Sequence, residues 1–128
     1  MLNETNAFER LKKVLAESLD IEPNDIQLNQ KLFVDYTVES TETLEITFRL
    51  EQEFDLTMED DEFWNIANLI ANNGMYNGKF TEEAVQLIQS NFDISEDVIQ
   101  SLDSPFSIYH HITINDLLKY TLKKTNNS

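Results

Sequence analysis

Only two glycines and two prolines interrupt this chain of 128 residues, and this scarcity limits the folds that it can adopt. Apolar residues recur at helical spacing through most of the sequence, and no segment shows the alternation of apolar and polar residues that is typical of a half-buried strand. We therefore predict an all-α protein. The expected helices cover about residues 6–19, 40–54, 60–73, 81–91 and 95–102, with a last helix that starts after Thr113.

The absence of cysteine and of long apolar runs narrows the class of protein. Without cysteine the chain has no disulfide, no thiolate nucleophile and no zinc–thiolate site. It shows neither an N-terminal signal pattern nor an apolar stretch long enough to span a bilayer. Its length suits one domain with a modest core. We expect a cytoplasmic monomer with a single domain over residues 1–128.

Acidic residues dominate the charge, which is −15 from 24 acids and nine bases. Residues 35–62 contain eleven of the acids, and Arg49 is the only base among them. Such a surface repels the phosphates of nucleic acids and anionic membranes, so we expect neither as a partner. It attracts basic patches on other proteins, although a strongly charged surface can also serve solubility alone.

The predicted helix at residues 40–54 carries two apolar stripes. Ile46, Leu50 and Phe54 fall on one side, which is the expected core face. Leu44 and Phe48 fall on a different side, with acidic residues around them. Either another helix covers this second stripe, or the stripe docks a partner through apolar anchors inside a charged rim.

Ser40 stands at the start of this helix. Serine at that position is either a helix cap or a hydroxyl available for attachment of another group. Two other polar clusters are weak candidates for a metal site. The acids at residues 59–62 lack the ligand spacing of a calcium loop. His110 and His111 have no cysteine or acid pair near them in the sequence. No nucleophile–base pair is visible either, so we expect a protein that holds no metal and is not an enzyme.

Residues 35–54, DYTVESTETLEITFRLEQEF, resemble the acyl carrier protein family. The family pattern D-L-G-x-D-S-L matches Asp35 and Ser40, with Glu39 in place of its second Asp, Thr37 in place of its Gly and Thr41 in place of its last Leu. The family's helix end, apolar-E-x-E-F, is matched at Leu50, Glu51, Glu53 and Phe54. Similar opening and closing helices extend the resemblance to residues 8–62 and 107–124.

The resemblance implies a four-helix bundle and a covalent 4′-phosphopantetheine on Ser40, attached by a phosphopantetheinyl transferase. The arm would carry acyl or aminoacyl thioesters to acyl-activating, elongating or transferring enzymes, as in fatty acid or polyketide biosynthesis. These enzymes would dock through basic patches. The residues expected to bind them are Glu39, Thr41, Glu42, Leu44, Glu45, Phe48 and Glu51.

Residues 63–106 have no counterpart in a minimal carrier. We predict that they form a helical insertion that enlarges the core, although a lid over the arm or a separate docking surface would also account for them. The alternative to a covalent carrier is an unmodified interaction module, which keeps the carrier shape and docks a partner through the acidic helix.

Overall fold

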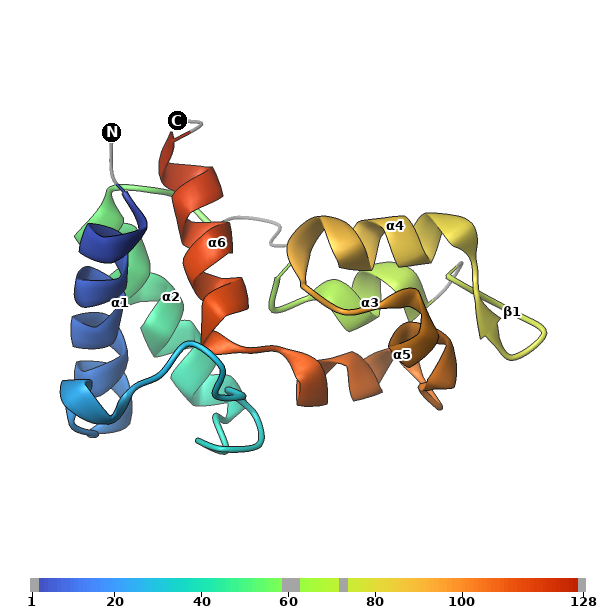
Figure 1. Cartoon of the computed structure of the whole chain (residues 1–128), viewed down its shortest axis with the longest axis horizontal. Helices are drawn as coiled ribbons and strands as arrows, with labels where there is room; N and C mark the ends of the chain where they lie inside the picture. Colours follow the sequence, from blue (N-terminus) through green and yellow to red (C-terminus); the bar gives the residue numbers. More distant parts are fainter. Residues whose placement is uncertain (1–2, 59–62, 72–73, 127–128) are drawn as a thin grey trace. The chain divides into compact units, whose positions relative to one another are not determined.

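The structure, a computed structural model, describes residues 3–58, 63–71 and 74–126, apart from the side chains of residues 40 and 126. In chain order its elements are α1 (Glu4–Leu19), η1 (Pro23–Asp25), α2 (Ser40–Phe54), α3 (Ile66–Ala71), β1 (Met75–Tyr76), β2 (Lys79–Phe80), α4 (Glu82–Asn91), α5 (Glu96–Ser101), η2 (Pro105–His111) and α6 (Ile114–Asn126). They form two compact units (Figure 1). Unit 1 contains α1, η1, α2 and α6, and unit 2 contains the remaining elements.

Unit 1 is a helical bundle in which α1, α2 and α6 pack on one another. The predicted core face of α2 is confirmed, because Ile46 and Leu50 are fully buried and Phe54 is 4% exposed. The opposing helices bury apolar residues at helical spacing, as an amphipathic helix must in order to form a core. These residues are Ala7, Leu11, Val14 and Leu15 of α1, and Ile114, Leu117, Leu118 and Tyr120 of α6.

The long segment between α1 and α2 is tied to the start of α6. The backbone N–H groups of Ile114 and Asn115 donate to the carbonyls of Gln30 and Leu28, both at 2.9 Å. Leu32 is fully buried beneath this connection. The Leu28 side chain is 36% exposed and does not anchor the loop. Its backbone carbonyl makes the connection instead.

Unit 2 contains a small hairpin that the sequence pattern did not predict. β1 and β2 pair in antiparallel register, Met75 opposite Phe80 and Tyr76 opposite Lys79. Asn77 (φ 52°) and Gly78 (φ 78°) make the turn, and positive φ at both positions suits the twist of a two-residue hairpin. The Gln100 side chain of α5 holds β2, accepting from the Phe80 N–H and donating to the Phe80 carbonyl, each at 2.9 Å.

The helix predicted at residues 60–73 is shorter in the structure. α3 begins only at Ile66, after a turn at residues 63–65, and the ends of the predicted helix lie outside the described residues. Phe63 is fully buried against Phe92, with 5.0 Å between ring centroids. Trp64 is half-buried, and Leu69 is 46% exposed although it stands at helical spacing from the buried Ile66.

Candidate functional site

Ser40 is the first residue of α2, and the helix is capped by its neighbour. Glu39 is the N-cap residue, with extended backbone (φ −104°, ψ 169°). Its N–H donates to the Glu42 carboxylate at 2.9 Å, and its carbonyl accepts from the Thr43 N–H at 3.0 Å. The reading of Ser40 as the helix cap is therefore wrong, because Glu39 and Glu42 perform that function as a capping box.

The turn before Ser40 is held in a conformation that favours glycine. Thr37 has φ 47°, in the left-handed region that β-branched residues rarely adopt. On one side of Thr37, Asp35 accepts from the Lys31 N–H at 2.7 Å. On the other, Val38 is 7% exposed and its N–H donates to the Leu32 carbonyl at 3.2 Å. The turn thus has the positive φ that favours glycine, although threonine stands where the family pattern has glycine.

Tyr36, beside this turn, donates its hydroxyl to Gln30 Oε1. Burial raises the pKa of Tyr36, because desolvation disfavours the phenolate, and the charges of Asp35 and Asp25 raise it further, against the lowering effect of the Gln30 contact. The phenol therefore stays protonated and holds the loop at neutral pH.

The second apolar stripe of α2 is open to solvent. Leu44 is 72% exposed and Phe48 is 60% exposed, so the helices of unit 1 leave both uncovered. Thr41 and Glu45 are exposed beside them, as is Glu39 at the helix start. Glu42 and Glu51 are half-buried. Six of these residues lie within α2 after Ser40, and the seventh, Glu39, is its N-cap residue. Glu51 also contributes to the local fold, because its carboxylate accepts from the Met58 N–H at 2.8 Å.

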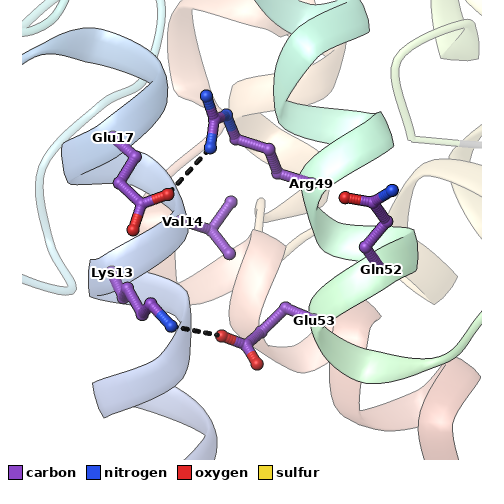
Figure 2. A pocket seen from close by; sticks show the side chains of 6 residues that line it. All are labelled: Lys13, Val14, Glu17, Arg49, Gln52 and Glu53. Carbon is purple, nitrogen blue, oxygen red and sulfur yellow. Dashed lines mark hydrogen bonds and ion pairs between the residues drawn. The ribbon is translucent and has the colours of Figure 1, made fainter.

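Ion pairs between α1 and α2 neutralise part of the acidic charge of these helices (Figure 2). Arg49 contacts Glu17 of α1 at 2.7 Å and Glu45 of its own helix at 3.2 Å. Lys13 contacts Glu53 at 3.5 Å. A cavity of about 170 Å³ lies beside these ion pairs, lined by Lys13, Val14, Glu17, Arg49, Gln52 and Glu53. In the sequence Arg49 is a single base among acids, and no residue near it along the chain indicates that it pairs with Glu17, 32 residues away.

The sequence singled out two other polar clusters, the acids at residues 59–62 and the pair His110 and His111. Within residues 3–58, 63–71 and 74–126, no three His, Cys, Asp or Glu side chains gather as a metal site. The acids at residues 59–62 lie outside the described part of the chain. His110 and His111, expected in a loop, belong to η2. No helix in the described part is long and apolar enough to cross a membrane.

A family model described as the phosphopantetheine attachment site matches residues 9–71, a range that includes Ser40. The acyl carrier protein of Petrotoga mobilis is 26% identical over 90 residues, which cover 70% of this chain and 92% of the relative. That of Clostridium acetobutylicum is 29% identical over 62 residues, 48% of this chain and 80% of the relative. No solved structure matches the chain.

The acyl carrier protein of Buchnera aphidicola subsp. Acyrthosiphon pisum (strain Tuc7) is 37% identical over 57 residues, which cover 44% of this chain and 71% of the relative. The similarity thus reaches most of a complete carrier, and the family model covers α1, the loop, α2 and α3. These matches agree with the helical bundle and with the motif around Ser40. The chain belongs to the acyl carrier protein family.

Proposed function

We propose that this protein carries acyl or aminoacyl groups as thioesters on a 4′-phosphopantetheine arm esterified to Ser40. As a member of the acyl carrier protein family it is a carrier and not an enzyme, and its prosthetic group is covalently attached. The observation that supports Ser40 as the attachment point is its place at the first residue of α2, next to a cap that does not depend on it.

The residues around Ser40 fit such a group. The flanking residues Glu39 and Thr41 are exposed, which leaves room for a modifying enzyme to approach. The first turn of a helix carries unpaired N–H groups and the positive end of the helix dipole, and both favour a phosphodiester. When bound, the arm supplies a terminal thiol that holds the cargo as a thioester. The chain itself anchors the arm and presents a surface to partners.

We propose that this surface comprises the exposed residues of α2 that follow Ser40. Leu44 and Phe48 would supply apolar anchors, and Glu39, Thr41, Glu42 and Glu45 would form the polar rim. Contacts of this kind are weak and sensitive to salt, which suits a carrier that must leave one enzyme and visit the next. The prediction that Glu51 also binds partners has less support, since its carboxylate already accepts a hydrogen bond from the Met58 N–H.

An unmodified interaction module is the second candidate function. It is favoured by the exposure of Leu44 and Phe48, because these side chains could dock a partner whether or not Ser40 is modified. In either case we propose that the part of unit 2 beyond the family match at residues 9–71 is an insertion into the carrier bundle, since α6 returns to pack on α1 and α2 after it.

Intact mass separates the two candidates. The purified chain is incubated with coenzyme A and a broad-specificity phosphopantetheinyl transferase, beside a carrier known to be modified. We expect a mass gain of one phosphopantetheine in the wild type and in Thr41→Ala, which removes the neighbouring hydroxyl, but none in Ser40→Ala. Failure of the wild type to gain mass while the control carrier does would favour the unmodified module.

A further inference from the structure

Unit 2 contains a groove of mixed aliphatic and polar lining that the carrier function does not use. It lies between α3 and α4 and has a volume of about 150 Å³. Its lining consists of Leu69 and Ile70 of α3, Gly74, Thr81, and Glu83, Ala84 and Leu87 of α4. A void of this size lined by aliphatic side chains has room for one branched or aromatic side chain.

The floor of the groove is rigid. The Gly74 N–H donates to the Ile70 carbonyl at 2.6 Å, and the Gly74 carbonyl accepts from the Thr81 N–H at 2.8 Å. A Cβ at Gly74 would lie 2.4 Å from the Ile70 carbonyl oxygen and 2.7 Å from Ile70 Cβ, so a larger residue there would force these atoms to shift. The Thr81 hydroxyl caps α4 by accepting from the Ala84 N–H at 3.1 Å. The backbone groups of Gly74 and the Thr81 hydroxyl are thus paired, and the aliphatic side chains of Leu69 and Leu87 remain available for contact.

The rim carries charge of one sign. Among the described residues, Glu83 is the only ionisable one that lines the groove, and Glu82 beside it is also exposed. Lys79 is the only Lys or Arg between residues 60 and 112, against nine acids. An occupant with a lysine or arginine near its apolar side chain would therefore gain electrostatic attraction here, whereas an acidic one would be repelled.

We propose that this groove is a second docking site, which takes an amphipathic helix of a basic partner protein. A leucine-sized side chain of that helix enters between Leu69 and Leu87, and a flanking lysine or arginine pairs with Glu83. Leu69, which is 46% exposed, forms the open edge of the groove and loses this exposure on binding. The site lies in unit 2 and does not involve Ser40 or the exposed residues of α2.

The test uses the full-length, unmodified chain labelled with ¹⁵N and a synthetic peptide of about 15 residues. The peptide has leucine on one helical face and lysine on the others. Two control peptides share its length: one has the same composition in scrambled order, and the other has glutamate in place of lysine. Chemical shift changes locate the peptide, and a titration gives its Kd.

We expect the amphipathic basic peptide to shift residues that line the groove, and both control peptides to bind at least about tenfold more weakly. Leu69→Ser should weaken binding about tenfold and Glu83→Gln severalfold with a smaller salt dependence. Tyr76→Ser is the matched control, because Tyr76 is 74% exposed in the same unit without lining the groove.

The proposal is overturned by any of three results: no binding, shifts confined to α2, or equal binding of the scrambled peptide, which would mean that charge alone attracts it. Equal losses in Leu69→Ser and Tyr76→Ser would also overturn it. None of these results bears on the modification of Ser40, so the carrier function and the second docking site succeed or fail separately.

Discussion

Replacing Thr37 by glycine should stabilise unit 1. Thr37 holds a φ of 47° in the turn before Ser40, a conformation in which the Cβ of an L-residue crowds the backbone. Glycine has no Cβ and adopts this conformation freely. The family pattern has glycine at this position, so the substitution restores the residue that the backbone geometry favours.

The expected gain follows from two opposing effects. A non-glycine residue pays roughly 1–2 kcal/mol for the left-handed conformation, which glycine avoids. Glycine also makes the unfolded chain more flexible, which costs about 0.4–1 kcal/mol. The Thr37 hydroxyl donates to the Tyr36 carbonyl at 2.8 Å, but this bond is exposed and water replaces it at little cost. The middle of each range gives a net gain of about 0.8 kcal/mol, or roughly 3–6 °C in Tm for a unit of this size.

Thermal unfolding followed by circular dichroism, with a urea titration beside it, measures the effect. Thr37→Ala removes the branched side chain but keeps the Cβ, so it should not reproduce the gain. Thr57→Gly is the matched control for flexibility, because Thr57 is exposed and does not have positive φ. It should lower stability. If Thr37→Gly leaves Tm unchanged or lowers it as Thr57→Gly does, the left-handed strain that we infer at Thr37 is absent.

Two further predictions concern α2. Phe48→Ala should cost well under the roughly 2–5 kcal/mol expected for Ile46→Ala in urea unfolding, because Phe48 is 60% exposed and Ile46 is fully buried; equal losses would show that Phe48 belongs to a core and is not free to dock. Arg49→Gln breaks the ion pairs with Glu17 and Glu45 at a cost of at most about 1 kcal/mol, since all three side chains are partly exposed. Because it frees the Glu45 carboxylate, it should also raise the affinity for a basic partner such as a phosphopantetheinyl transferase, measured as a lower Kd; an unchanged or higher Kd would mean that Glu45 does not contribute to docking.

Several features of the fold could be predicted because their signals are local. The bounds of α2 agree with those expected, and Ser95 and Thr113 cap α5 and α6 as their positions indicated. A cap and an amphipathic stripe each depend on residues within one or two turns, so a single sequence contains the information. The hairpin was missed although Asn77 and Gly78 are a strong turn signal, since strands of two residues are too short to alternate.

The sequence by itself determined the helical class, the core face of α2 and the place of Ser40 at the head of an acidic helix, because spacing along one helix decides which residues share a face. Only the tertiary structure decided that Leu44 and Phe48 are left uncovered in unit 1, that Arg49 pairs with Glu17, and that Leu69 edges a groove although its spacing indicated burial. These outcomes depend on which side chains from distant parts of the chain come within a few ångströms of one another. Packing of whole helices sets those distances, and no periodicity within one segment encodes them.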